Sequence, residues 1–297
     1  MKTSVTFNSA GQTLAGDLYL PDGYVDGTQL PGVVVTGAWT TVKEQMAGTY
    51  AAQLADRGFA ALAFDFRGWG ASPDDVPYLE NPTRKTQDIE AAVEYLASRP
   101  EVLVDRIGGL GVCASSGYMS DAALNSKWIK SVALVAPWLH DKTIVNDVYG
   151  GESGVAALIA AGRDAERAPN PVILEAASLT NEQAVMYQAP YYTDPSTGLV
   201  PEYDNQFNAA SWEGWLTYDA MVTAKLTSQP TLLVHSEAAA IPQGARQYAE
   251  LLGDKATTRW LDNVTQFDFY SEPEAVQTAS DAVAAHFTKT LTQSGEK

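Results

Sequence analysis

The one cysteine of the chain lies where a strand pattern changes directly into a helix pattern. Arg106–Val112 is a short apolar run typical of a buried strand, and Ala114–Leu124 can form a helix directly after it. Cys113 falls between them, and the small residues Gly111 and Ser115 flank it two positions away on each side. A nucleophile in a sharp strand-to-helix turn needs such neighbours, because larger side chains would clash. Since a helix start also lowers the pKa of a thiol, we predict that Cys113 is a nucleophile.

Two other interpretations of this segment remain open. A lone cysteine often serves only as a small apolar core residue. Ser115 is a rival nucleophile, because Cys113-Ala114-Ser115-Ser116-Gly117 also places a hydroxyl between small residues. The strand pattern ends at Gly111, however, so Ser115 would fall half a turn inside the helix, and this register favours Cys113.

An acyl intermediate on Cys113 would need hydrogen-bond donors for its oxyanion. The backbone N–H of Ala114, at the start of the helix, is the first predicted donor. The second is expected from the loop that follows the third strand, Thr36–Trp39, with the N–H of Ala38 as the predicted group.

Strands and helices alternate along most of the chain, which predicts a mostly parallel sheet covered by helices on both faces. The predicted strands are Val5–Phe7, Leu14–Tyr19, Pro31–Thr36, Phe59–Phe66, Arg106–Val112, Ile129–Pro137, Pro230–His235 and Thr257–Leu261. The predicted helices are Lys43–Arg57, Thr83–Arg99, Ala114–Leu124, Gly244–Leu252 and Glu272–Thr290. We expect the last residues, Gln293–Lys297, to form a frayed tail.

The alternation stops between Trp138 and Leu226, a segment rich in aromatic residues. We predict a core formed by residues 1–137 and 227–297, with residues 138–226 inserted as a lid over an apolar pocket. The alternative is a small helical subdomain with a core of its own. The predicted substrate-binding residues are Trp39, Trp138, Tyr191, Trp212 and Trp215.

Composition excludes several classes of protein and site. The 297 residues are 45% hydrophobic and 19% charged, which is typical of a folded globular chain. The net charge of −17 repels nucleic acid and anionic lipid surfaces, and no apolar run is long enough to span a membrane. One cysteine excludes a disulfide framework, and with three histidines and no HExxH motif we expect no metal site. With no signal peptide visible, we expect a cytoplasmic protein with a small-molecule substrate; a homodimer is one oligomeric state that the sequence allows.

The sequence resembles the α/β-hydrolase superfamily along nearly its whole length. Phe64–Ser72 (FDFRGWGAS) is similar to the D-x-R-G-x-G-x-S segment of that superfamily, and Leu232–Ser236 is similar to the strand before its acid loop. Val42–Met46 and Phe267–Tyr270 are similar to a narrower branch, the dienelactone-hydrolase-like proteins and fungal polyketide transferases. The G-x-C-x-S turn at Cys113 is similar to the cysteine variant found in dienelactone hydrolases.

The resemblance implies an α/β-hydrolase fold with a mostly parallel eight-stranded sheet, flanking helices and a helical lid between strands 6 and 7. It also implies chemistry on an apolar ester, lactone or thioester, such as a polyketide-type metabolite, without a metal or an organic cofactor. Two positions depart from the pattern. The only carboxylate in the loop where the triad aspartate is expected is Glu237, and the triad histidine is replaced by Gln266. A glutamine cannot act as a general base near neutral pH.

His140 is the predicted substitute for the missing base. It follows the sixth strand, at the end of the sheet that faces the site, and Asp141 lies beside it. An equally weighted alternative is a loop histidine that anchors the insertion. We expect His235, at a strand end, to be structural and His286, in the last amphipathic helix, to contribute to packing.

Three functional hypotheses follow. The favoured one is an acyl hydrolase or acyltransferase that uses Cys113, in which acyl transfer or cyclisation is easier than hydrolysis because water lacks a base. The second is a cyclase or lyase in which Cys113 is never acylated. The third is a ligand-binding protein with a degenerate triad.

Overall fold

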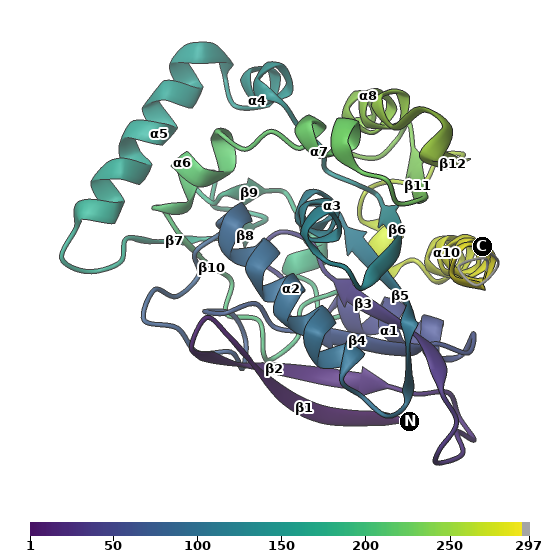
Figure 1. Cartoon of the computed structure of the whole chain (residues 1–297). Helices are drawn as coiled ribbons and strands as arrows, with labels where there is room; N and C mark the ends of the chain where they lie inside the picture. The colour runs from purple at the N-terminus through teal and green to yellow at the C-terminus, as the bar shows by residue number, and fades with distance from the viewer. Residues whose placement is uncertain (293–297) are drawn as a thin grey trace.

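The computed structural model describes residues 1–292, so the predicted frayed tail Gln293–Lys297 lies outside the described residues. An eight-stranded sheet forms its centre, in the order β1-β2-β4-β3-β5-β6-β11-β12 (Figure 1). The strands are β1 (Lys2–Ser9), β2 (Gln12–Tyr19), β3 (Leu30–Thr36), β4 (Ala60–Phe64), β5 (Val102–Val112), β6 (Ile129–Val135), β11 (Thr231–Ser236) and β12 (Ala256–Leu261). The pairs β1–β2 and β2–β4 are antiparallel and the other pairs are parallel, so the predicted mostly parallel sheet is confirmed.

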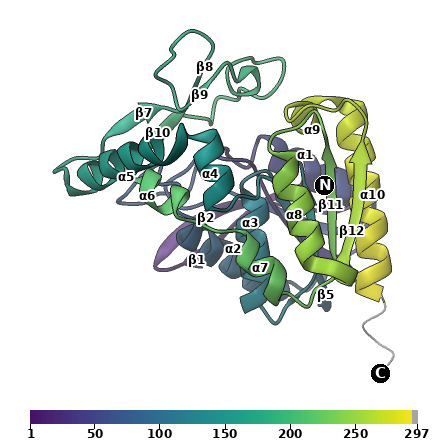
Figure 2. The same cartoon turned by 90° about the horizontal axis from the view of Figure 1, so that it is seen from above.

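Helices cover both faces of the sheet, as the parallel strands require. On one face α1 (Met46–Ala55) contacts α10 (Pro273–Thr292), and on the other α2 (Pro82–Ala97) contacts α3 (Ser115–Asn125). Figure 2 shows α8 (Pro242–Leu252) and α10 on opposite sides of β11 and β12. Within residues 1–292, no helix combines the length and apolar character that crossing a bilayer requires.

The strand that leads to Cys113 is clamped between two helices. A Cβ on Gly108 would lie 2.7 Å from Cε1 of Phe287 in α10, and a Cβ on Gly109 would lie 2.3 Å from Sδ of Met119 in α3. Two glycines in succession therefore let a helix approach each face of β5. β5 begins at Val102, four residues before the predicted start at Arg106. The exposed residues Asp105 and Arg106 separate the apolar residues Val102–Val104 from the buried run that starts at Ile107, so the sequence pattern does not join the two parts.

The segment 138–226 separates β6 from β11 and contains helices, as predicted, together with short strands that the sequence did not predict. Its helices are α4 (Lys142–Val148), α5 (Gly151–Arg167), η1 (Pro190–Tyr192), α6 (Ser211–Leu216) and α7 (Met221–Leu226). Its strands are β7 (Ile173–Glu175), β8 (Ala177–Ser178), β9 (Met186–Tyr187) and β10 (Gln206–Asn208), paired as β7–β10 and β8–β9. These pairs form where the sequence has neither a long apolar run nor helical spacing. In Figure 2 the segment extends to one side of the main sheet.

Candidate active site

Cys113 occupies a strained turn between β5 and α3, with a φ of +58°. Its backbone is fixed on both sides, because its N–H donates to the carbonyl of Val135 (3.1 Å) and its carbonyl accepts from the N–H of Trp138 (3.0 Å). A residue other than glycine adopts this φ only where its surroundings hold it there, and such residues concentrate at functional sites. The turn therefore points the thiol out of the sheet at a defined position.

Burial dominates the chemistry of the Cys113 thiol. Only 6% of the residue is exposed, and burial raises the pKa of the thiol above its usual value. Interactions of the thiol with the Tyr270 hydroxyl, the N–H groups of Ala114 and Trp39 and the Gln266 side chain oppose this rise in pKa but do not overcome it. The lowered pKa expected from the helix start is thus outweighed by desolvation, and the free protein holds a neutral thiol near pH 7.

Of the two backbone N–H groups predicted as oxyanion donors, that of Ala114 interacts with the Cys113 thiol and that of Ala38 does not. Ala38 N–H donates instead to Sδ of Met46 (3.4 Å), while its carbonyl accepts from the hydroxyl of Thr41 (2.7 Å). The second donor facing Cys113 is the N–H of Trp39, one residue later. The prediction of Ala38 is wrong because the sequence does not show how far the loop turns after β3.

The buried carboxylate of Glu80 is hydrogen-bonded to the loop that follows β3. Glu80 accepts hydrogen bonds from the N–H of Thr40 (3.3 Å), from Nζ of Lys85 (2.7 Å) and from the hydroxyl of Tyr118 (2.9 Å). Thr40 has a φ of +64°, and its hydroxyl bonds to that of Tyr203 (3.0 Å). These bonds hold Thr40 in a conformation that a threonine rarely adopts. They therefore also restrain the backbone of the preceding residue, Trp39, whose N–H interacts with the Cys113 thiol.

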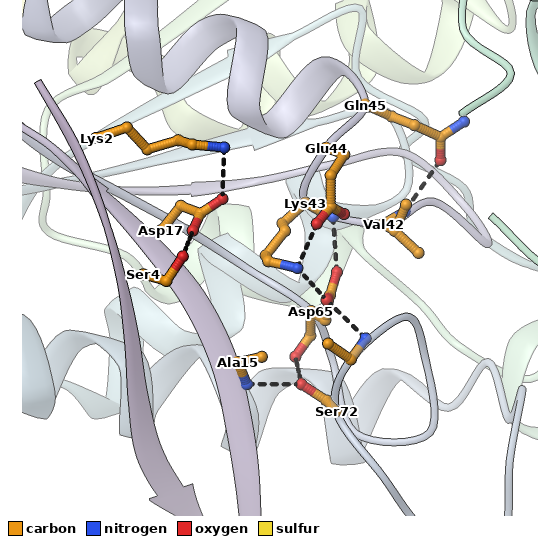
Figure 3. Close-up of polar contacts among 11 residues, drawn as sticks. Lys2, Ser4, Ala15, Asp17, Val42, Lys43, Glu44, Gln45, Asp65 and Ser72 are labelled. Carbon is orange, nitrogen blue, oxygen red and sulfur yellow. Dashed lines mark hydrogen bonds and ion pairs between the residues drawn. The ribbon is translucent and has the colours of Figure 1, made fainter. Parts of the chain in front are cut away.

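A second network fixes the far end of the same loop (Figure 3). Asp65 accepts from the backbone N–H of Lys43 (2.7 Å), from its Nζ (2.8 Å) and from the N–H of Ala71 (3.0 Å). Gln45 accepts from the N–H of Val42 (3.0 Å) and donates to the carbonyl of Gly198 (2.7 Å) in the segment 138–226. Hydrogen bonds therefore join the loop after β3 both to the loop after β4 and to the segment 138–226.

Gln266 lies beside Cys113, where the sequence places it, and its amide makes three hydrogen bonds. Oε1 accepts from the N–H of Ala240 (3.0 Å), while Nε2 donates to the carbonyl of Ala136 (2.9 Å) and to the hydroxyl of Tyr270 (2.7 Å). The sequence analysis missed Tyr270 as a site residue. Tyr270 lies in the short helix α9 (Asp268–Ser271), four residues after Gln266, which lies in the turn before that helix. That four-residue spacing is the signal that could have pointed to it.

Glu237 lies away from the site. Its side chain is 63% exposed, and it forms an ion pair with Arg246. The prediction that it serves as the acid of a triad is therefore wrong. No carboxylate among the described residues lines the cavity at Cys113.

His140 is not available as a base, so this prediction is also wrong. It is 1% exposed, its Nδ1 accepts from the indole N–H of Trp138 (3.0 Å), and its Nε2 donates to the carbonyl of Trp215 (3.2 Å). Burial lowers its pKa to about 4. Both contacts of the His140 ring are to residues of the segment 138–226, as the alternative interpretation of a histidine that anchors the insertion expects. His235 packs against Trp260, His286 is hydrogen-bonded through Nε2 to the hydroxyl of Ser131 (2.9 Å), and none of the three histidines lines the cavity.

A cavity of about 510 Å³ opens at Cys113. None of its lining side chains is charged, although the chain carries a net charge of −17. The lining residues are Trp39, Cys113, Ala114, Trp138, Val148, Tyr149, Val185, Met186, Tyr187, Gln188, Ala189, Tyr192, Trp215, Ala240, Gln266, Phe267 and Tyr270. This volume is typical of a small-molecule site with mostly aromatic and apolar walls.

Two of the predicted substrate-binding residues lie outside this lining. The hydroxyl of Tyr191 accepts from the N–H of Met46 (3.0 Å), in the core behind the site. Trp212 packs behind Trp39, with ring centroids 6.1 Å apart. Both predictions are wrong because aromatic composition does not distinguish a cavity wall from the layer that supports it. In residues 1–292, no group of three or more histidine, cysteine, aspartate or glutamate side chains is placed to hold a metal ion.

Comparisons with known proteins match the chain over most of its length. The sequence model of a family described as "Alpha/beta hydrolase family" matches residues 33–279. Uncharacterized protein PA2218 of Pseudomonas aeruginosa is 34% identical over a region that covers 79% of this chain and 67% of that protein. Uncharacterized protein YcjY of Escherichia coli is 27% identical over 98% of this chain and 100% of that protein.

The crystal structure of the Pseudomonas aeruginosa protein is similar to this fold, with a TM-score of 0.84 at 25% identity over 98% of this chain and 94% of that chain. A shorter match joins this chain to Polyketide transferase claH of Penicillium crustosum. It is 32% identical over 127 residues, which are 41% of this chain and 40% of that protein.

Proposed function

The chain belongs to the alpha/beta hydrolase family, and on this basis we propose that it transfers the acyl group of an apolar ester, lactone or thioester through Cys113. The observation that carries the proposal is the position of this residue. Cys113 occupies a strained turn, and its thiol faces two backbone N–H groups and an uncharged aromatic cavity. This arrangement suits a nucleophile with an oxyanion site.

The proposed reaction begins with the acyl carbonyl against Sγ of Cys113. Sγ attacks the carbonyl carbon, and the N–H groups of Trp39 and Ala114 stabilise the oxyanion that forms. The bond to the leaving oxygen or sulfur breaks as the carbonyl re-forms, and the proton of Cys113 ends on the leaving group. An acceptor then attacks the acylated Cys113, takes the acyl group, and its proton returns to Sγ.

The absence of a base from the cavity lining favours transfer or cyclisation over hydrolysis. Among the described residues, neither a histidine nor a carboxylate lines the cavity, so nothing there deprotonates a water molecule. An amine or thiol acceptor depends less on such a base. A thioester donor depends least on acid catalysis, because a thiol has a pKa of about 8.5 and leaves readily as its anion.

The cavity favours a neutral, apolar acyl group. A carboxylate or ammonium group bound against these walls would lose its hydration without gaining a partner of opposite charge. We further propose that residues 138–226 act as a lid over the core formed by 1–137 and 227–297, since Tyr149, Met186 and Trp215 in this segment line the cavity. The name of the relative claH, a polyketide transferase, supports an acyl donor of polyketide type.

The experiment that tests this function follows acylation of Cys113 by intact mass. The protein is incubated with a panel of neutral and carboxylated acyl thioesters of N-acetylcysteamine and with p-nitrophenyl esters. We expect one acyl group on wild type with the neutral thioesters, none on Cys113→Ala, and release of the group when an amine is added. Rapid turnover to free acid would contradict transfer, and failure of every donor would contradict the nucleophilic role of Cys113.

A second candidate function is supported by the neutral, buried Cys113 thiol and by Gln266, which cannot move a proton as histidine does. In a cyclase or lyase the same N–H groups would stabilise an enolate, and Cys113 would not be acylated. Activity on a candidate substrate that persists in Cys113→Ala would favour this function over acyl transfer.

A further inference from the structure

A tyrosine hydroxyl, rather than an imidazole, lies beside the sulfur of Cys113. Tyr270 and Cys113 line the same cavity, and the interaction of the Tyr270 hydroxyl with the Cys113 side chain opposes the rise that burial causes in the pKa of the thiol. Tyr270 is buried, and its ring packs edge-on against that of Tyr191, with centroids 5.1 Å apart. The hydroxyl is therefore held in place between the core and the reacting thiol.

The hydrogen bonds of Gln266 determine which way the Tyr270 hydroxyl points. The N–H of Ala240 can only donate and the carbonyl of Ala136 can only accept, so the Gln266 amide has Oε1 toward Ala240 and Nε2 toward Ala136. The second hydrogen of Nε2 then points at the oxygen of Tyr270, 2.7 Å away. Since that oxygen accepts from Gln266, the hydroxyl proton is free to be donated to Sγ of Cys113.

Tyr270 cannot work as an ordinary base. Burial and the neighbouring Cys113 raise its pKa well above the usual value, so the phenol stays protonated at every pH at which the protein would be assayed. A phenol can still pass a proton on, because its oxygen accepts one proton while it gives up another. This exchange leaves Tyr270 neutral before and after.

We propose that Tyr270 is a catalytic residue that relays the proton of Cys113 to the leaving group, and that Gln266 is the positioning residue that aims its hydroxyl. The inference rests on the proposed acyl transfer through Cys113. When an acyl donor is bound, the Tyr270 hydroxyl turns its proton from Sγ to the leaving group, so that its oxygen presents a lone pair to the thiol. As Sγ bonds to the acyl carbon, the thiol proton passes to the Tyr270 oxygen, and the original hydroxyl proton passes to the departing sulfur or oxygen. One S–H bond is lost and one bond to hydrogen is formed on the leaving group, so the step balances.

The relay explains how a glutamine occupies the position where the superfamily pattern has a histidine. The Gln266 amide does not move a proton itself. Instead it orients the Tyr270 hydroxyl, which moves the proton in place of a histidine. A relay of this kind works best when the leaving group holds its proton about as tightly as Cys113 does. A thioester meets this condition, because its leaving thiol and Cys113 have the same chemistry.

The test is single-turnover acylation of the whole protein by a neutral acyl thioester of N-acetylcysteamine, read by intact mass. We expect Tyr270→Phe to acylate roughly 100-fold more slowly than wild type, with a similar half-saturating thioester concentration. Gln266→Glu should also slow acylation, because a carboxylate would accept the Tyr270 proton and turn the hydroxyl away from Cys113. Tyr50→Phe is the matched control: the Tyr50 hydroxyl donates to the carbonyl of Phe269 in α9 (2.8 Å), so this variant perturbs α9 without removing a contact to the thiol.

A solvent isotope effect on wild type gives a second measurement that does not depend on a variant folding. Relay through Tyr270 predicts slower acylation in D₂O, and loss of this effect in Tyr270→Phe. Wild-type rates in Tyr270→Phe would overturn the relay and leave acyl transfer through Cys113 standing. Failure of wild type to acylate with any donor would overturn the proposed function itself, so the two failures are distinguishable.

Discussion

Gly111 and Ser115 meet across the turn that carries Cys113. A Cβ placed on Gly111 would lie 2.6 Å from the carbonyl oxygen of Ser115, a separation that packed atoms do not tolerate. The hydroxyl of Ser115 donates to the carbonyl of Gly37, which lies two residues before Trp39 in the loop that follows β3. The same pair of small residues thus shapes the turn and joins it to the neighbouring loop.

We expect Gly111→Ala to destabilise the protein by about 1–3 kcal/mol, the usual cost of overpacking. The contacting atom is backbone, so the turn itself must move. Chemical denaturation measures this change. Gly214→Ala in α6 is the control, because its nearest neighbour is a side-chain atom of Asn81 at 3.3 Å. Equal stability of the two variants would contradict the argument.

The Cys113 thiol should react slowly with iodoacetamide at pH 7 and faster as the pH rises. Burial raises its pKa, so the reactive thiolate forms only above the usual thiol value of about 8.5. Intact mass measures the single alkylation, with the protein in guanidinium as the control for a free thiol. Faster alkylation in the folded protein than in guanidinium at pH 7 would show an activated thiolate instead.

Glu80→Gln should destabilise the protein by roughly 3 kcal/mol, because it leaves the ammonium of Lys85 buried without a counter-charge. We also expect slower acylation of Cys113, since Glu80 holds the N–H of Thr40 next to the donor Trp39. Thermal unfolding and the acylation assay measure the two effects.

The control for this prediction is Glu213→Gln, which breaks the exposed ion pair between Glu213 and Arg163. Exposed pairs contribute little to stability, so its unfolding should stay near that of wild type. A similar loss in both variants would mean that burial of the Glu80–Lys85 pair has no special effect.

His140 should make the protein less stable as the pH falls from about 6.5, the usual histidine pKa, toward 4. Its folded-state pKa is lowered to about 4, so in this window the unfolded chain binds a proton that the folded chain does not. The loss reaches up to about 3 kcal/mol once both states are protonated. His140→Gln should flatten the stability profile between pH 6.5 and 5 in urea titrations, while Cys113 still acylates at pH 7.5. An unchanged profile, or a large loss of acylation without a loss of stability, would contradict this role.

Gln266→His should convert the proposed acyl transfer into hydrolysis. The imidazole would replace the Gln266 amide next to Cys113 and supply a base that can activate water against the acylated thiol. Intact mass should show a transient acyl group that decays to free acid, where wild type retains it. Gln266→Met is the control, because methionine is similar in size to the residue that it replaces but supplies no base. A stable acyl group on Gln266→His would contradict the prediction.

The strands, the strand-to-helix turn and the position of Gln266 could be predicted, because each depends on a local pattern. Apolar runs such as that in β3 specify buried strands, and the spacing of Gly111, Cys113 and Ser115 specifies a tight turn. The predicted ends of α2 differ from the observed ones by at most two residues, since Asn81 caps the helix and Pro82 begins it.

The polar partners of Cys113 could not be predicted, because they depend on which groups burial leaves facing one another. Tyr270 resembles any other aromatic residue until the bonds of Gln266 fix its hydroxyl. His140 next to Asp141 looks like a base until Trp138 and Trp215 occupy both ring nitrogens. A shift of one residue in the loop after β3 exchanges Ala38 for Trp39 as a donor.

The contacts of Gly108 with Phe287 and of Gly109 with Met119 have a consequence for local dynamics. The strand that leads to Cys113 cannot open without separating helices on both faces of the sheet, so its amide protons should exchange with solvent only when the whole domain unfolds. The segment that contains Met186 and Tyr187 has short strands and few buried side chains, so its amides should exchange through far less costly fluctuations. We therefore expect access to the cavity to depend on motions of residues 138–226, while Cys113 keeps a fixed position.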